Sequence, residues 1–158
     1  MNMSINLDSI DRKILALLEQ NARISNAELA EKVNLSPTPC LRRLRKLEKS
    51  GLIKAYTAIL DEKALGLQAS ALVFVNLVRN TKENAEQFEA ALVLLPEVLE
   101  CYVVAGRHDY VLRIVTRDLD DYERFIKERL AVLEEIANLE SIFVLKQTLS
   151  GRKLPIPG

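Results

Sequence analysis

The chain has 158 residues, with 22 Lys and Arg against 22 Asp and Glu. That length allows one ordinary hydrophobic core or two small ones, and no apolar run reaches the roughly 20 residues that span a bilayer. No charged segment followed by an apolar one marks a signal peptide at the start of the chain. We therefore expect a cytoplasmic protein that does not bind membranes.

The net charge of zero hides an asymmetry between the two ends of the chain. Residues 1–60 contain 10 Lys and Arg against 6 Asp and Glu, a balance of +4, which leaves 12 against 16, a balance of −4, in residues 61–158. Basic segments attract the phosphates of nucleic acids. The asymmetry therefore predicts that the first 60 residues contact DNA.

Two capping patterns predict the first helices of this basic end. Asp8 is placed to cap a helix whose apolar residues recur at helical spacing, and Ser25 and Glu28 match the S-x-x-E capping box. The apolar positions of the first helix are Leu7, Ile10, Ile14, Leu17 and Leu18. A longer helix and a short one are therefore predicted before Asn34.

A third helix is predicted after Ser36, whose hydroxyl is placed to accept an unpaired backbone N–H. Pro37 and Pro39 fall in its first turn, where a helix tolerates proline. At about 100° per residue, apolar side chains gather on one face and cations on the other. The apolar face carries Cys40, Leu44 and Leu47, and the opposite face carries Thr38, Arg42, Arg45, Lys46 and Lys49. This pattern is typical of the recognition helix of a helix-turn-helix.

The charged face of the third helix has two interpretations. A solvated surface is the ordinary one, but six cations between residues 42 and 54 face only Glu48, which favours contact with DNA phosphates. We adopt the second interpretation. The expected DNA contacts are Ser25, Asn26, Ser36, Pro37, Thr38, Pro39, Arg42, Arg43, Arg45, Lys46 and Lys49.

The recognition helix should end near Gly51, since glycine is common just past a helix C-terminus. Residues 53–61 are rich in β-branched and aromatic side chains, which predicts an extended segment. Gly66 and a weak periodicity make 61–69 the best candidate for a linker. The expected organisation is a DNA-binding domain at 1–60, a second domain at 70–148 and a tail at 149–158.

The second domain has the β-α-β-β-α-β pattern of a ferredoxin-like α+β sandwich. Two of its stretches, 71–75 and 101–105, are apolar on both pleat faces, whereas two crossover helices cover only one face of a sheet. We expect a second copy of the sheet to cover the other face, in a homo-oligomer. The predicted strands are Ala71–Val78, Val98–Ala105, Tyr110–Thr116 and Glu140–Thr148, and the predicted helices are Lys82–Leu95 and Leu119–Leu133.

The hairpin from Gly106 to Tyr110 is the best candidate for a small-molecule site. Gly106 allows a tight turn that exposes N–H groups to a carboxylate, and Asp109 is suited to an ammonium, so that together they suit a zwitterionic amino acid. Taken alone, a Gly-x-x-Asp turn is usually an ordinary hairpin. His108, the only histidine, is then a polar residue at its tip.

Three segments, 7–15, 22–30 and 35–43, carry a resemblance to a known family, the last through the run Leu-Ser-Pro-Thr-Pro-Cys. Over nearly its whole length the chain resembles the Lrp/AsnC family, the feast/famine transcriptional regulators. The resemblance implies an α+β fold with a three-helix winged helix-turn-helix before the ferredoxin-like domain. It also implies binding of double-stranded DNA, an amino-acid effector, and dimers that assemble into octamers.

The resemblance gives the turn a role. In this family the turn that matches Gly106, Asp109 and Tyr110 lines an effector pocket between neighbouring dimers, and we include Arg107 and His108 between them. The chain departs from the family at residues 134–138, where many members have a small glycine-containing turn that helps to shape the pocket. The candidates for this far wall are Ile136, Asn138 and Ser141.

One histidine and two unclustered cysteines, Cys40 and Cys101, argue against a metal site, and we expect both thiols to be buried. No hydrolase or nucleotide-binding motif is present, and no cofactor is expected. The sirohaem decarboxylases resemble this family but depend on histidines, and an architectural DNA-compacting protein without an effector is the other alternative. We predict a non-enzymatic regulator of amino-acid metabolism whose effector changes its assembly and thereby its DNA binding.

Overall fold

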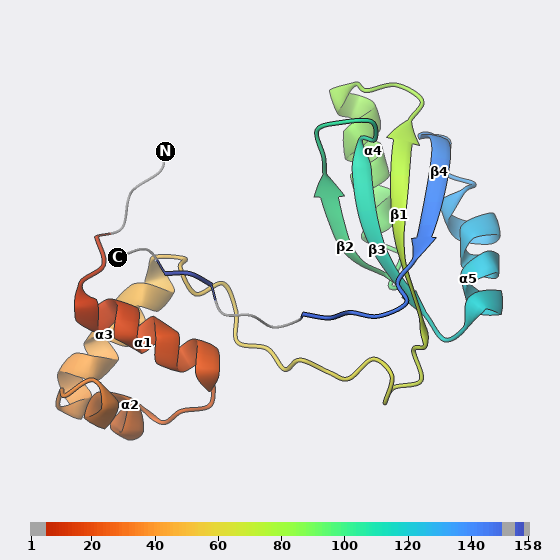
Figure 1. Ribbon diagram of the computed structural model, residues 1–158. Coiled ribbons are helices and arrows are strands. Elements are labelled where there is room, and N and C mark those ends of the chain that lie inside the picture. The colour runs from red at the N-terminus through yellow and green to blue at the C-terminus, as the bar shows by residue number, and fades with distance from the viewer. Residues whose placement is uncertain (1–5, 150–153, 157–158) are drawn as a thin grey trace. The chain divides into compact units, whose positions relative to one another are not determined.

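The computed structural model describes residues 6–149 and 154–156. These residues form two compact units, one made of residues 6–59 with Leu149 and residues 154–156, and one from Leu60 to Thr148 (Figure 1). Each unit has a hydrophobic core made of its own residues. The fold predicted from the sequence, a helix-turn-helix followed by a ferredoxin-like domain, is confirmed.

The first unit contains helices α1 (Ser9–Gln20), α2 (Asn26–Lys32) and α3 (Pro37–Lys49). Both predicted N-terminal caps form, because Asp8 accepts a hydrogen bond from the backbone of α1 and Ser25 and Glu28 complete the capping box of α2. The apolar faces of the three helices meet in one core. Its buried side chains are Ile14, Leu18, Leu29, Ala30, Val33, Cys40 and Leu47.

The start of α3 differs from the prediction in one respect. Ser36 is the N-cap, but its hydroxyl accepts no capping hydrogen bond. The usual donors lie at the second and third helical positions, and Pro39 at the third has no N–H. A different contact ties α2 to this helix start, since Asn26 Nδ2 donates to the carbonyl oxygen of Pro37 at 2.9 Å.

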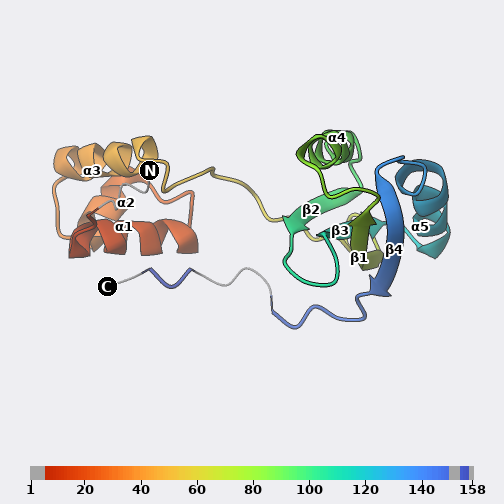
Figure 2. The ribbon, with the colours of Figure 1, turned by 90° about the horizontal axis from the view of Figure 1, so that it is seen from above.

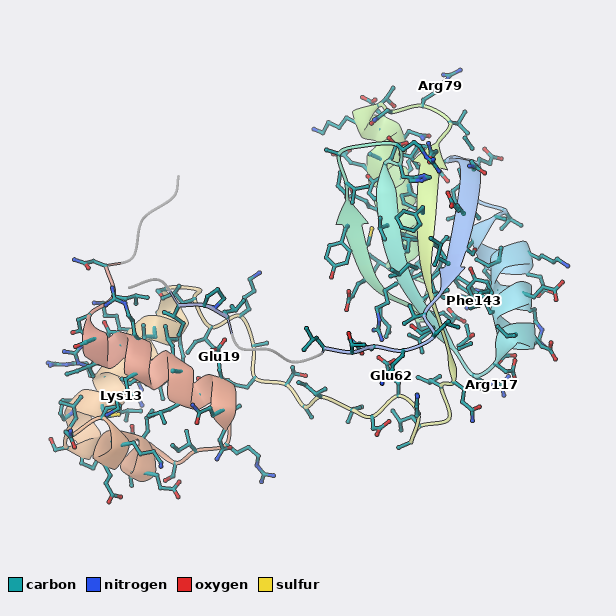
Figure 3. All side chains as sticks on the ribbon, in the orientation of Figure 1. Lys13, Glu19, Glu62, Arg79, Arg117 and Phe143 are labelled. Carbon is teal, nitrogen blue, oxygen red and sulfur yellow. The ribbon has the colours of Figure 1, made fainter. Side chains whose placement is uncertain are left out.

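The segment after α3 carries no β-wing within the described residues of the first unit. Gly51 ends the helix with a positive φ of 77°, as predicted, and residues 54–60 then form neither helix nor strand. The predicted linker 61–69 lies inside the second unit. Within this segment the carboxylate of Glu62 accepts a hydrogen bond from Arg113 Nη2 at 2.7 Å. Figure 3 shows Glu62 on the segment that leads into the sheet. A linker with its own ion pair to the domain is better described as part of that domain.

The second unit has the predicted order of strands and helices, with the sheet order β2-β3-β1-β4 and all neighbours antiparallel. Both helices lie on one face of the sheet, as Figure 2 shows. The elements are β1 (Ala69–Leu77), α4 (Lys82–Leu92), β2 (Val98–Val103), β3 (Tyr110–Thr116), α5 (Leu119–Phe125) with a π-helical turn (Ile126–Leu130), and β4 (Ile136–Phe143).

Several boundaries differ from the prediction. The last strand ends at Phe143 rather than Thr148, β2 ends at Val103 rather than Ala105, and α4 ends at Leu92 rather than Leu95, while β1 spans Ala69–Leu77. The last strand begins at Ile136 rather than Glu140, because it pairs with β1 as far as Leu77 across a bulge. The second helix changes to a π-helical turn after Phe125, with Ala131 N donating to the carbonyl of Ile126 at 2.8 Å. Sequence periodicity signals neither a register shift nor a π-turn.

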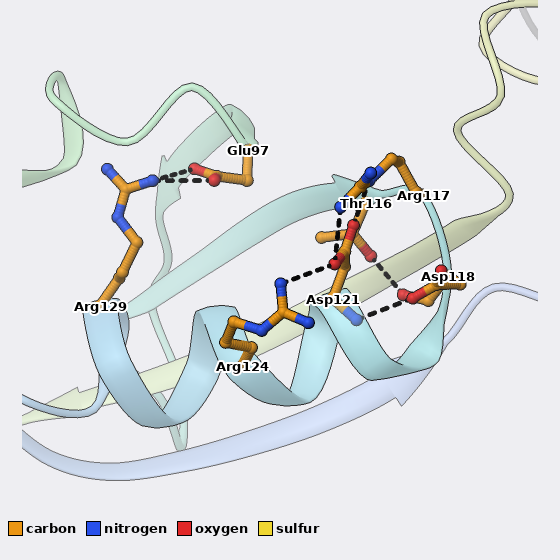
Figure 4. Close-up of polar contacts among 7 residues, drawn as sticks. All are labelled: Glu97, Thr116, Arg117, Asp118, Asp121, Arg124 and Arg129. Atoms are coloured by element: carbon orange, nitrogen blue, oxygen red, sulfur yellow. Dashed lines mark hydrogen bonds and ion pairs between the residues drawn. The ribbon is translucent and has the colours of Figure 1, made fainter.

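Polar contacts fix the connection from β3 into α5 (Figure 4). The buried Thr116 donates its hydroxyl hydrogen to the carbonyl of Asp118 at 2.8 Å, and Asp118 caps α5 by accepting from Asp121 N at 2.8 Å. Asp121 in turn forms ion pairs with Arg117 and Arg124, and the Arg117 contact lowers the pKa of Asp121. These contacts set the direction in which α5 crosses the sheet.

Candidate functional site

The exposed face of α3 carries four of the cations that the sequence predicts to contact DNA. The side chains of Arg42, Arg45, Lys46 and Lys49 are exposed, and none forms an ion pair with another described residue. With Thr38 they border a shallow hollow along the helix. An α-helix fits the DNA major groove, so this face can present guanidinium groups to bases and ammonium groups to phosphates.

Other predicted DNA contacts are engaged within the first unit. Ser25 completes the capping box of α2, and Asn26 donates to Pro37. Arg43, which the sequence placed among the phosphate-binding cations, binds two carboxylates of the α1 region. Sequence reasoning missed this pairing because the carboxylates lie more than thirty positions earlier in the chain. Ser36 and Pro37 are exposed at the start of α3, and Pro39 is half-buried there.

The acidic cap of α1 predicts a pH dependence. Asp8 accepts from Asp11 N at 2.8 Å and pairs with Arg43, and these contacts, the backbone hydrogen bond first, hold the pKa of Asp8 below its ordinary value. A carboxylate whose pKa is lowered by folding stabilises the native state above its unfolded pKa, and this contribution is lost as the pH falls.

We therefore expect Asp8→Asn to lower the unfolding temperature near neutral pH, and the gap from the wild type to shrink as the pH falls from about 6 to about 3. Thermal unfolding of both proteins across this range measures the gap. Glu31→Gln, at an exposed position of α2, is the matched control and should give a small, pH-independent difference. A gap for Asp8→Asn that stays constant down to the lowest pH would contradict this account.

The candidate effector site is the turn between β2 and β3. Asp109 braces this turn against the end of β1, since its Oδ2 accepts from Leu77 N at 2.8 Å and its Oδ1 accepts from Asn80 Nδ2 at 3.2 Å. Asp109 N also donates to the carbonyl of Val75 at 3.0 Å. The predicted ligand residue is therefore also a structural residue, and Gly106 lies nearby with nothing within 4 Å of where a Cβ would stand.

Two residues that the sequence did not single out organise the tip of the turn. Asn76 Nδ2 donates to the carbonyl of Arg107 at 3.0 Å, which directs Oδ1 toward His108 Nδ1 at 2.7 Å. Glu140 reaches the other side of the tip, 3.5 Å from His108 Nε2 and 3.4 Å from Arg107 Nη2. The one available signal was Asn76 itself, a polar residue near the end of a mostly apolar strand.

The strand register separates the remaining predicted pocket residues. Tyr110 is 3% exposed in the core on the helix side of the sheet, where it donates to Glu89 Oε1 at 2.8 Å, and burial with this contact raises the pKa of Tyr110 to about 12. Ser141 is also on the helix side and accepts from the Tyr122 hydroxyl at 2.5 Å, and Ile136 packs on the same core. Asn138, opposite Asn76, is the far-wall candidate on the open face. The far wall predicted from the sequence is therefore divided between two faces of the sheet.

The face of the sheet away from the helices is apolar along its middle. Leu72 and Phe74 alternate with the buried core positions of β1. Leu72 lies between Ile142 and Arg113, and Phe74 lies between Val111 and Glu140, with Tyr102 of β2 beyond Val111. Among the described residues of the second unit no helix or strand covers this surface, although Glu62, in the segment before β1, binds Arg113 on it. Tyr102 and Ile142 remain about half exposed, at 53% and 48%.

Comparison with known proteins identifies both units. Residues 7–54 match a family described as winged helix-turn-helix DNA-binding, and residues 70–154 match the Lrp/AsnC ligand binding domain. The chain belongs to the Lrp/AsnC family. Its DNA-binding and ligand-binding domains therefore coincide with the α3 surface and with the domain that carries the Gly106–Tyr110 turn.

Full-length relatives of this Lrp/AsnC protein include the transcriptional regulator AzlB of Bacillus subtilis, which is 39% identical over 154 residues and covers 98% of each chain. The leucine-responsive regulatory protein of Salmonella typhimurium is 41% identical over 152 residues, covering 95% of this chain and 92% of its own. Among solved structures, a Neisseria meningitidis transcriptional regulator in complex with L-Met superposes with a TM-score of 0.90 at 37% identity, covering 95% of this chain and 97% of that one.

Neither metal-binding clusters nor membrane-spanning helices occur in the part of this Lrp/AsnC protein that the structure describes. Cys40 is buried in the first core, as predicted, and burial raises the pKa of its thiol. The prediction for Cys101 is wrong, since its side chain is exposed. Cys101 lies on β2, an edge strand of the sheet, where fewer neighbours cover a side chain.

Proposed function

We propose that this Lrp/AsnC protein regulates the transcription of amino-acid metabolism genes, binding double-stranded DNA through α3 and a small amino acid at the Gly106–Tyr110 turn. Relatives named as leucine-responsive and a relative solved with L-Met support an amino-acid effector. The observation that carries the proposal is the position of the Asp109 carboxylate on this turn. A carboxylate offers about four acceptor positions, and the chain itself uses one on each oxygen, which leaves room for an ammonium group.

The proposed mechanism is thermodynamic linkage. An effector that binds between neighbouring dimers favours the assemblies in which its site is complete, and those assemblies fix the spacing of the helix-turn-helix units. Affinity for the effector and affinity for spaced DNA sites then depend on each other by the same factor. The residues we assign to the effector site are Gly106, Arg107, His108 and Asp109, with Asn138 from the open face.

The test is a thermal-shift screen of the twenty amino acids, followed by DNA footprinting with each amino acid that raises the unfolding temperature. A ligand at 100 times its Kd adds about 2.7 kcal/mol to stability, which such a screen detects readily. An unchanged unfolding temperature with all twenty would contradict effector binding and would favour the architectural alternative. An effector that binds but leaves the footprint unchanged would contradict the linkage.

We also propose a homodimer built on the open sheet face, with octamers as the higher assembly. The apolar side chains of Leu72, Phe74 and Val111 are better buried against a second sheet than left in water, and a two-fold symmetric pair uses the same surface twice. A dimer also supplies two recognition helices, which a helix-turn-helix reader places in successive major grooves.

We expect a fragment of residues 60–148 to self-associate at protein concentrations of roughly tens of micromolar. A fragment of residues 1–59 should remain monomeric at the same concentration. Phe74→Glu should shift the larger fragment toward the monomer, because it places a charge in the proposed interface. Val93→Glu, at an exposed position beyond α4, is the control and should leave the association unchanged. Analytical ultracentrifugation decides, and a folded, monomeric 60–148 fragment would defeat the argument.

We assign no catalytic activity to the protein, in keeping with relatives that are transcriptional regulators. One histidine offers little for the histidine-dependent decarboxylases that resemble this family. Purified protein incubated with a sirohaem substrate should show no new tetrapyrrole product. We place the protein in the cytoplasm, where a regulator of this kind meets DNA.

A further inference from the structure

The ion pair that holds Arg43 differs from the other contacts of the first unit in its burial. Arg43 Nη1 donates to Asp8 Oδ2 at 2.6 Å and to Asp11 Oδ1 at 2.8 Å. The side chain of Asp11 is only 4% exposed, whereas that of Arg43 is 31% exposed. One guanidinium of α3 therefore meets a buried carboxylate of α1.

A buried carboxylate without a cation is strongly unfavourable, because burial removes its hydration and the protein must replace it. Arg43 is the cation that both Asp8 and Asp11 contact among the described residues. A phosphate that withdrew Arg43 would leave Asp11 uncompensated. The ion pairs therefore keep the Arg43 side chain in contact with the α1 region, although Arg43 belongs to the helix proposed to bind DNA.

The ion pairs of Arg43 with Asp8 and Asp11 restrict the rotation of α3 about its own axis. Successive helical residues point about 100° apart, so anchoring Arg43 on α1 directs its neighbour Arg42 away from the core. Asn26 supplies a second tie at the start of α3 by donating to the Pro37 carbonyl at 2.9 Å. Two polar contacts from two other helices therefore hold the helix that presents Arg42.

We infer that Arg43 is a positioning residue for DNA recognition, which sets the orientation of α3 through Asp8 and Asp11 and contacts no phosphate itself. This inference rests on the DNA-binding role of α3. A phosphate contact supports binding to any sequence and contributes about 0.9 to the slope of log K against log salt concentration. A positioning residue supports the base contacts made by its neighbours and leaves that slope unchanged.

The experiment compares full-length wild type, Arg43→Gln and Lys46→Gln on two duplexes, one that the wild type selects from a random pool and one of unselected sequence. Arg43→Gln should lose about tenfold on the selected duplex, the scale of one lost base contact, and less than about twofold on the other. Its salt slope should equal that of the wild type. Lys46→Gln, an exposed cation of the same helix without an ion pair, should weaken binding to both duplexes alike and reduce the slope by about 0.9 for each bound unit.

The double variant Asp11→Asn/Arg43→Gln separates positioning from charge. It replaces the ion pair by two neutral amides and so leaves no uncompensated carboxylate at position 11, and it should bind the selected duplex within about threefold of the wild type. It also serves if the single variant does not fold, and circular dichroism and thermal unfolding report folding for both. Losses and a reduced salt slope like those of Lys46→Gln, in either variant, would overturn the inference. So would a double variant that binds the selected duplex no better than a folded Arg43→Gln.

Discussion

Replacing Arg42 by Ala should weaken binding to a cognate DNA site by about 1–3 kcal/mol and broaden the sequence preference. Arg42 is exposed in the first half of α3, and it lies one position before the residue that α1 holds. In helix-turn-helix proteins the early residues of the recognition helix contact base edges. A planar guanidinium can bind two acceptors of a guanine at once, which gives both affinity and selectivity.

Binding curves on the selected duplex and on unselected DNA measure this effect, with Lys49→Ala as the control. Lys49 is exposed in the last turn of α3, so its loss should weaken binding to both duplexes by the same factor. If Arg42→Ala also weakens both equally, Arg42 binds phosphate, and base recognition must come from another residue of the helix.

Asp109→Asn should weaken effector binding by about 1.5–3 kcal/mol, or roughly 10- to 150-fold, the usual contribution of a charge-assisted hydrogen bond to an ammonium. The substitution keeps an oxygen that can accept from Leu77 N, the brace seen in the structure. It removes the charge and replaces the oxygen that accepts from Asn80 Nδ2 by an NH2 group. DNA binding without effector should barely change, because α3 belongs to the other unit. Calorimetry with the amino acid found in the screen measures the loss.

Asp61→Asn is the matched control for Asp109→Asn. Asp61 also braces a turn by accepting a backbone N–H, from Ala64 at 3.0 Å, and it lies outside the proposed site. Its substitution should leave effector affinity unchanged. Normal effector binding by Asp109→Asn would reduce Asp109 to a structural brace and would move the ammonium site elsewhere, with the carboxylate of Glu140 as the nearest candidate at the tip of the turn.

The parts of the fold that depend on local chemistry could be predicted from the sequence. The capping box of Ser25 and Glu28, the cap at Asp8 and the glycine end of α3 each involve residues a few positions apart. The first residue of β4 could not be predicted, because it is set by pairing with a strand some sixty positions earlier and by a bulge opposite Leu77. No local pattern carries that information.

In the candidate sites too, the features set by local sequence could be predicted, and the contacts between distant residues could not. Helical spacing alone places Arg42 and Lys46 on the exposed face of α3. The count of cations between residues 42 and 54 assigned Arg43 to DNA, and such a count cannot reveal the buried carboxylate on another helix that Arg43 contacts. At the effector turn, the motif located Asp109 but not its partners on β1 and beyond, since those contacts exist only once the strands have paired.

The separate cores of the two units imply that the protein has two melting transitions rather than one. No buried residue is shared between the core of Ile14 and Leu47 and the core of Phe88 and Leu112, so a single two-state free energy does not describe the chain. A ligand added alone raises the transition of the unit that it binds. Calorimetric scans with one ligand at a time can therefore report occupancy of the DNA surface and of the effector site separately.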